Sequence, residues 1–113
     1  LLEGKVLSQS GPDITVETLL GNLHATKPPE KTFPDRVMVS IRPEQIRLAK
    51  PGSNARNAVT GKTTDSTFLG EASELYLDIN GHSLKVVTAP PLFDIPPTLS
   101  VEFDPQDVVV LAE

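Results

Sequence analysis

The sequence predicts an all-β protein, an OB-like barrel built from about nine short antiparallel strands. Two observations lead to this prediction. Several short segments alternate apolar and polar residues with a period of two, which is the pattern of a half-buried strand. The 11 prolines among 113 residues are spread along the chain, and interior prolines leave no room for a long helix. Many short strands separated by turns with Pro and Gly are typical of barrels and sandwiches.

Individual strands follow from local patterns. Three segments alternate most clearly: DITVET at 13–18, RVMVSI at 36–41 and ELYLDI at 74–79. After the third, Asn80-Gly81 supplies the positive φ angles of a two-residue hairpin turn, so we expect residues 74–79 to pair with His82–Thr88. Near the end, FDPQDVVVL predicts a strand, a turn at residues 104–107 and a final strand.

We expect one domain over residues 1–113. Two groups of strands, residues 1–49 and 58–113, flank the turn-rich segment KPGSNARN. Each group alone would bury too little surface to be stable, so the two groups are expected to share one core. No internal repeat is evident. The chain starts without Met, and we expect it to be part of a longer protein.

Charge and composition exclude several classes of protein. The net charge is −5, and from Thr64 onward nine acidic residues face the single base Lys85. This half lacks the positive surface that nucleic acids need, and four Phe and one Tyr offer few platforms for stacking bases, so no nucleic-acid partner is expected. The absence of Cys excludes a disulfide scaffold and a thiolate metal site.

No segment predicts a catalytic site, and we do not expect an enzyme. TGKTTD at 60–65 contains the Gly-Lys-Thr of a nucleotide-binding P-loop, but Arg56 stands where that loop needs its first glycine. We therefore predict a strand with an exposed Lys62. His24 and His82 are each isolated, whereas a metal site needs several converging ligands, so no metal and no cofactor are expected.

The segment VSIRPEQIRLA at 39–49 places a cation, a proline and an anion between two apolar runs. Pro43 is expected to end the preceding strand and to start a helical turn over Pro43–Ile46. Arg42 offers donors that suit a carboxylate, either Glu44 or an acid of the second half. Two interpretations stay open: a corner between two sheets that an ion pair fixes, or an Arg42 that holds an anionic ligand. We favour the corner.

The order of these motifs resembles a known family. VSIRPEQIRLA, then NAVTGKTTDSTFLGEASELYLDINGHSLKV, then LSVEFDPQDVVVLAE are similar to the C-terminal transport-associated OB (TOBE) domain of bacterial ABC importer ATPases of the maltose, iron(III) and spermidine/putrescine type. The opening LLEGKV is similar to the first strand of that family. The residues that match the family motif are Arg42, Pro43, Glu44, Phe68 and Gly70.

This resemblance implies a regulatory and dimerisation domain that is coupled to solute uptake across the inner membrane. The implied partners are its own ATPase domain, the second ATPase subunit of a homodimer and the membrane permease subunits. The implied location is cytoplasmic, peripheral on the inner face of the bacterial plasma membrane. ATP and Mg would belong to the ATPase domain, so this fragment would hold no cofactor.

The resemblance also offers an alternative function. Related modules of molybdate importers bind an oxyanion near an S-A-R-N motif, and SNARN at 53–57 is similar to it. Ser53, Arg56 and Asn57 are therefore candidate anion-binding residues of a molybdate-type β module. The later ligand strand of those modules is not matched, because VVTAPPL has prolines in its place.

Overall fold

The structure, a computed structural model, describes residues 1–112 and contains ten strands in two antiparallel sheets of five. The first sheet has the order β10 (Val108–Ala112), β4 (Arg36–Ile41), β1 (Leu2–Ser10), β2 (Asp13–Thr18) and β3 (Gly21–Thr26). The second has the order β5 (Arg47–Leu48), β9 (Thr98–Phe103), β6 (Asn57–Phe68), β7 (Ser73–Ile79) and β8 (His82–Thr88). The all-β, OB-like prediction is confirmed, with one strand more than expected.

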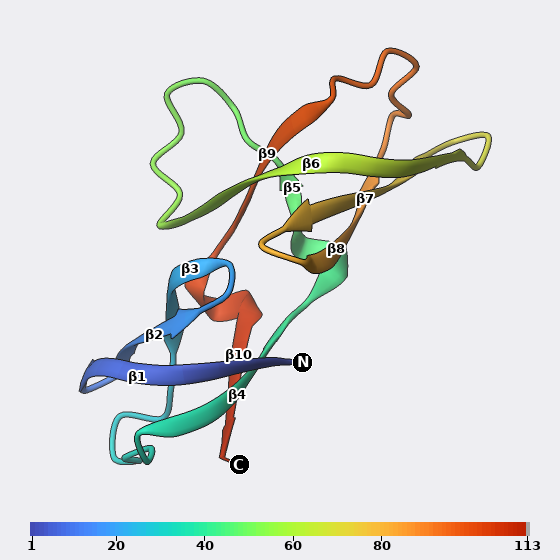
Figure 1. Cartoon of the computed structure of the whole chain (residues 1–113). Helices are drawn as coiled ribbons and strands as arrows, with labels where there is room; N and C mark the ends of the chain where they lie inside the picture. The colour runs from blue at the N-terminus through green and yellow to red at the C-terminus, as the bar shows by residue number, and fades with distance from the viewer. Residues whose placement is uncertain (113) are drawn as a thin grey trace.

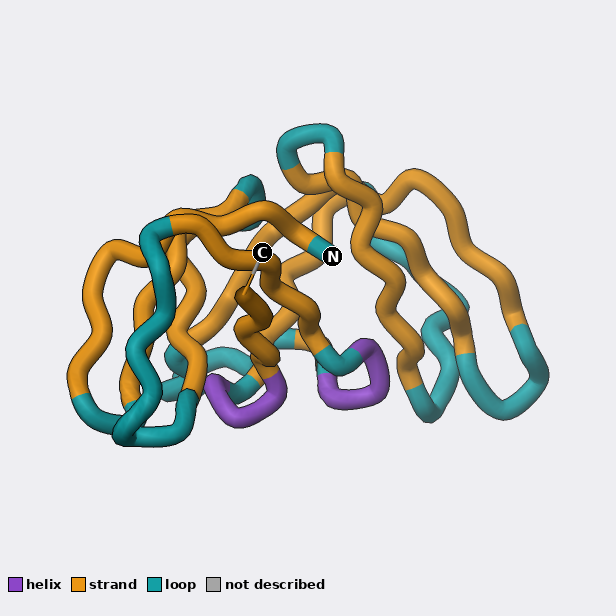
Figure 2. Tube along the Cα trace, turned by 90° about the horizontal axis from the view of Figure 1, so that it is seen from below, coloured by secondary structure: helices purple, strands orange, loops and turns teal. Residues whose placement is uncertain are grey.

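Each curled sheet forms one lobe of an elongated molecule that measures 45 × 26 × 23 Å (Figure 1). Two 3₁₀ helices, η1 (Pro43–Gln45) and η2 (Pro105–Asp107), lie between the lobes (Figure 2). Each begins with a proline, whose fixed φ suits the first helical position, and the helical turn predicted at Pro43 is confirmed. No helix in the described part of the chain is long and apolar enough to cross a membrane.

The two lobes repeat one arrangement of strands. In chain order, β1, β2, β3, β4 and η1 correspond to β6, β7, β8, β9 and η2. The strand after each 3₁₀ helix is exchanged, because β5 pairs with β9 of the second lobe and β10 pairs with β4 of the first. The expectation of no internal repeat is therefore wrong. The sheets also do not follow the groups 1–49 and 58–113, since one strand of each group lies in the other sheet.

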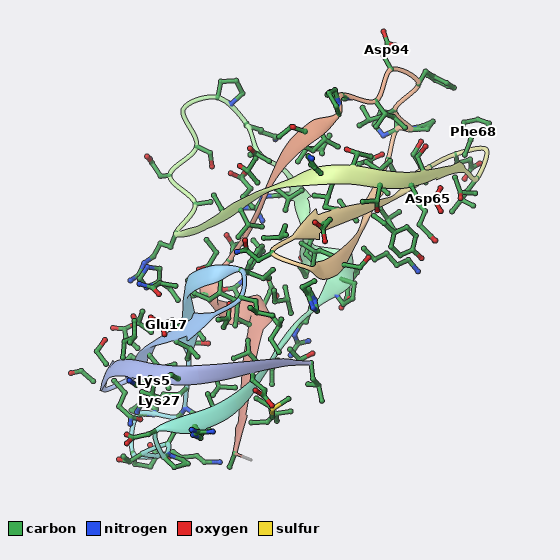
Figure 3. The ribbon with its side chains drawn as sticks, in the orientation of Figure 1. Lys5, Glu17, Lys27, Asp65, Phe68 and Asp94 are labelled. Carbon is green, nitrogen blue, oxygen red and sulfur yellow. The ribbon has the colours of Figure 1, made fainter. Side chains whose placement is uncertain are left out.

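The repeat extends to the pairing of single residues. Leu7 in β1 and Thr64 in β6 are the extra residues of two bulges, which fall at the same step of the two ladders. Figure 3 shows Lys5 and Glu17 together on the first lobe. The cross-strand pairs that precede the bulges are equivalent: Lys5–Glu17 in the first lobe and Lys62–Asp78 in the second.

The repeat is hard to find in the sequence because few identical residues carry it. Gly4-Lys5 and Gly61-Lys62 occupy equivalent positions, as do the prolines that start η1 and η2. Glycine is needed at Gly61, because a Cβ there would lie 2.8 Å from the backbone oxygen of Asp78. Most other equivalent positions share only their apolar or polar character, which is all that strand pairing and burial require.

One continuous cluster of buried apolar side chains extends through both lobes. Leu75, Leu77 and Ile79 face it from β7, in the predicted alternation, and the hairpin after them has positive φ at Asn80 (51°) and Gly81 (86°), as predicted. The continuous cluster supports one domain over residues 1–113, which stays a prediction because folding of the separate halves would be its test.

Candidate functional site

The segment Ser53–Asn57 connects the second lobe to the edge of the first. Asn57 is the first residue of β6, and only 1% of its surface is exposed. Its side-chain oxygen accepts a hydrogen bond from the backbone N–H of His24 at 2.7 Å, and its Nδ2 donates to the backbone oxygen of His24 at 2.8 Å. The amide thus continues the ladder of β3 and attaches β6 to it.

The ring of His24 lies among polar groups on the same face. Its Nδ1 is 3.2 Å from the hydroxyl of Thr15 and 3.3 Å from a terminal nitrogen of Arg56. Because a guanidinium can only donate, Nδ1 accepts from Arg56, and a neutral ring then carries its proton on Nε2. The arrangement leaves Nε2–H as a donor beside a cationic side chain.

Arg56 is exposed, and no carboxylate of residues 1–112 lies within ion-pair distance of it. Ser53 is also exposed, and its hydroxyl accepts from the backbone N–H of Ala55 at 3.2 Å in the preceding turn. Guanidinium, imidazole and hydroxyl donors are the groups that proteins use for oxyanions. The amide of Asn57, in contrast, is engaged by β3. Of the three candidate residues, Ser53 and Arg56 have side chains at the surface, while Asn57 has a structural role.

The equivalent face of the second lobe is chemically different. Tyr76 and Lys85 stand opposite each other there, as Thr15 and His24 do in the first lobe. Tyr76 donates to Glu74 at 2.9 Å, and the Lys85 ammonium is 3.3 Å from the same carboxylate. The hydrogen bond from Tyr76, followed by that from Lys85, lowers the pKa of Glu74, and the same bond to Glu74 raises the pKa of Tyr76. An internal anion therefore already neutralises the cation of this face.

Arg42 does not make the predicted ion pair. It lies between the end of β4 and Pro43, where the turn into η1 leaves its side chain exposed, and Glu44 is exposed as well. No acid of the described residues 1–112 is within ion-pair distance of Arg42. The corner is held instead through the backbone, because the N–H of Arg42 donates to the carbonyl of Asp107 at 3.0 Å. This bond joins the two crossing segments, residues 42–46 and 104–107, which lead from one sheet to the other.

Arg47, which the sequence did not single out, makes the ion pairs at this corner. Its Nε is 3.3 Å from Glu102, and a terminal nitrogen is 3.1 Å from Asp104. The bond to Asp104 raises the pKa of Arg47 against the opposing effect of burial. The Glu102 side chain is 4% exposed, so Arg47 compensates a buried charge where β5 crosses to the second sheet. The available signal was the position of Arg47, the second Arg of VSIRPEQIRLA, directly before the apolar strand residue Leu48.

Phe68 and Gly70 lie at the end of the second lobe, where Phe68 pairs with Ser73, the residue before Glu74. Phe68 is the last residue of β6, and Gly70 has a φ of 90° in the turn that follows. The role of the motif residues Arg42, Pro43, Glu44, Phe68 and Gly70 in the family stays a prediction. No group of three potential metal ligands occurs among the described residues.

Comparison with known proteins identifies the family. The family model of the TOBE domain matches residues 39–111, which include both crossing segments and all strands of the second lobe. No curated protein sequence is significantly similar to the chain. Among solved structures, the cytoplasmic molybdate-binding protein ModG, in a form with molybdate bound, has a similar fold with a TM-score of 0.74 at 14% identity, over 99% of this chain and 94% of that one. The residues matched by the family model show that the chain belongs to the TOBE domain family.

Proposed function

We propose that this TOBE domain is the accessory domain of the ATP-binding subunit of an ABC-type importer, where it regulates and dimerises the subunit. Its partners are its own ATPase domain, the second ATPase subunit and the membrane permease, on the cytoplasmic face of the inner membrane. The domain is not an enzyme. ATP and Mg are bound by the ATPase domain, and nucleic acid is not a partner.

The observation that carries this proposal is the family match over residues 39–111, joined to the order of motifs along the chain. The geometry agrees with an accessory role. Gly61-Lys62 lies within strand β6 and is not followed by a helix, so no phosphate-binding loop is built around it. Without a nucleotide site at this place, the exposed side chains of both lobes are available for contacts with other proteins.

The sequence that precedes Leu1 in the full reading frame tests this proposal. We expect an ATPase domain there, with a P-loop and an LSGGQ motif. In the isolated 113-residue chain, calorimetry with ATP and Mg should give no saturable binding. A reading frame without an ATPase domain, or micromolar ATP binding by the isolated chain, would contradict the proposal.

A second candidate function is binding of a small oxyanion. It is favoured by Arg56, an exposed cation without an ion-pair partner among residues 1–112, which lies beside His24. The likeness of fold to a molybdate-bound protein supports this candidate through the fold alone. The opposing observation is the loop after β8, where prolines occupy the place of the ligand strand expected from the resemblance.

Titration calorimetry with molybdate, sulfate and phosphate separates the two candidates. If the face binds an oxyanion, Arg56→Gln should abolish the binding. Lys62→Gln is the matched control, because it removes an exposed cation from β6, the strand that follows Arg56, at a different place. Absence of heat with all three anions removes this second candidate and leaves the importer proposal untouched.

A further inference from the structure

The equivalent loops β3–β4 and β8–β9 each contain a phenylalanine, which is buried in the first loop and exposed in the second. In the loop between β3 and β4, Phe33 is 6% exposed, and the side chain of Gln9 makes two hydrogen bonds to its backbone, at 2.8 and 2.9 Å. In the loop between β8 and β9, Phe93 is 82% exposed. That loop is nevertheless anchored, because the hydroxyl of Ser73 contacts both the backbone N and O of Leu92 at 3.1 Å.

The exposed ring does not stand alone. Phe93 lies against Phe68 with ring centroids 5.4 Å apart and planes tilted by 43°. Phe68 is 58% exposed, and its neighbour Leu69 is exposed too. We call Phe68, Leu69 and Phe93 the aromatic tip. Its two rings come from the end of β6 and from the β8–β9 loop and are already in contact, so an incoming apolar side chain would need to order little.

The surroundings of the aromatic tip are acidic. Asp65, Glu71 and Asp94 are exposed, and Figure 3 shows Asp65, Phe68 and Asp94 at the same end of the second lobe. None of these three acids has an ion-pair partner among residues 1–112. Lys85 is the only base between residues 63 and 98, and Glu74 already binds it. The tip therefore combines apolar surface with uncompensated negative charge.

We propose that the aromatic tip is a docking site for a basic segment of a partner protein, which places an apolar side chain against the two rings and its cations near Asp65, Glu71 and Asp94. Charge decides between this occupant and two others. An anionic lipid surface would be repelled by the acids, and so would the tip of a second copy of the chain. The proposal stands independently of the importer function and of the oxyanion candidate, because it involves neither ATP nor Arg56.

The chain offers its own reporters for a test. It has four Phe and no Trp, and Phe33 and Phe103 are buried while Phe68 and Phe93 form the tip. With fluorophenylalanine incorporated, a short synthetic peptide of Lys and Leu that carries one Trp should shift the ¹⁹F signals of Phe68 and Phe93 saturably. The buried rings should not respond. The fluorescence of the peptide Trp should shift to the blue as it binds.

Variants of the tip should weaken this binding in two separate ways. Phe68→Ser with Phe93→Ser should raise the Kd about tenfold or more, since buried aromatic anchors dominate such interfaces. Asp65→Asn, Glu71→Gln and Asp94→Asn together should also weaken binding and remove its dependence on salt. Leu7→Thr is the matched control, because it replaces an exposed apolar residue by the residue at the equivalent bulge of the second lobe. It should leave the Kd unchanged.

Several outcomes would overturn the proposal. Absence of a response at Phe68 and Phe93 is one. Equal binding of a peptide with Glu in place of Lys is another, because it would show that charge plays no part. Self-association that requires the two rings would identify a second copy as the occupant, and ring-dependent binding to phosphatidylglycerol vesicles would identify a membrane.

Discussion

The two lobes carry different chemistry at the same place of the same sheet. On the first lobe, Thr15 and His24 stand beside Arg56, whose charge has no acidic partner among residues 1–112. On the second, the equivalent pair of Tyr76 and Lys85 surrounds the carboxylate of Glu74. Pairing register fixes where the side chains lie but not what they are. The repeat can thus keep one face available to an outside anion while the other holds an internal one.

The lobes also differ in what surrounds an equivalent glycine. Backbone lies close to Gly61, whereas the nearest neighbours of Gly4 are side chains. A Cβ at Gly61 would lie 2.6 Å from the side chain of Ile79 and 2.8 Å from the backbone oxygen of Asp78, whereas a Cβ at Gly4 would meet the side chains of Val16 and Val39. Gly61→Ala should therefore lower the free energy of unfolding by about 3 kcal/mol, and Gly4→Ala by about 1–2 kcal/mol, since backbone cannot move aside as a side chain can. Urea denaturation measures both, and a larger loss for Gly4→Ala would contradict the comparison.

The hydrogen bonds that attach β6 to β3 are a contact between the two lobes that a single mutation can remove. Asn57→Ala removes both hydrogen bonds to the backbone of His24 and leaves those groups without a partner, which should cost about 2–3 kcal/mol. Asn57→Asp keeps the acceptor for the N–H of His24 but places a buried carboxylate oxygen against the carbonyl of His24, so it should cost at least as much at neutral pH. Thermal denaturation followed by circular dichroism compares the two. If Asn57→Ala melts like the parent, the amide does not hold the lobes together.

Mutations in and beside the two crossing segments should have a smaller effect on stability. Arg47→Ala leaves the buried carboxylate of Glu102 unpaired and should cost about 1–2 kcal/mol, less than a fully buried pair would, because the Arg47 side chain is 42% exposed. Arg42→Ala, on the other side of η1, removes an exposed side chain and should cost under about 0.5 kcal/mol. Equal losses would restore the ion-pair corner that the sequence predicted at Arg42.

Much of the fold could be predicted from local patterns. The alternation in residues 74–79 and Asn80-Gly81 were sufficient for the β7–β8 hairpin, because a two-residue turn and its flanking strands form from neighbouring residues. The exchange of β5 and β10 could not be predicted. Arg47–Leu48 pairs with residues more than fifty positions away, and a two-residue strand has no periodicity of its own.

The candidate site was predictable only in part. The resemblance points to Arg56 and Ser53, but the sequence shows His24 only as an isolated residue, because sequence distance conceals that β3 lies beside the start of β6. For a similar reason the sequence predicts the ion pair at Arg42, whereas the structure has it at Arg47. Pro43 marks the end of β4 clearly, yet which neighbouring side chain is buried depends on the partner strand β9, which the sequence does not specify.

The smallest expected effect concerns the internal anion of the second lobe. Tyr76 and then Lys85 lower the pKa of Glu74 in the folded protein below the value of about 4.3 for an unfolded chain. The ionised carboxylate therefore stabilises the fold above that unfolded value, and this stabilisation is lost as pH falls through the lower pKa of the folded state. Glu74→Gln should melt slightly below the parent at neutral pH, and the difference should vanish in acid, once pH has fallen below the lowered pKa of Glu74 in the folded state.

Asp13 provides the matched control, since it holds the position in β2 that Glu74 holds in β7, with Thr15 and His24 in place of Tyr76 and Lys85. Asp13→Asn should not reproduce the pH-dependent difference, because Thr15 and His24 supply neither a phenol donor nor an ammonium. Melting temperatures measured between neutral pH and about pH 3 at low salt test both variants, as salt weakens exposed pairs. If the Glu74→Gln difference persisted unchanged in acid, the charge of Glu74 would not be its source, and the chemical contrast between the two faces would have no energetic consequence.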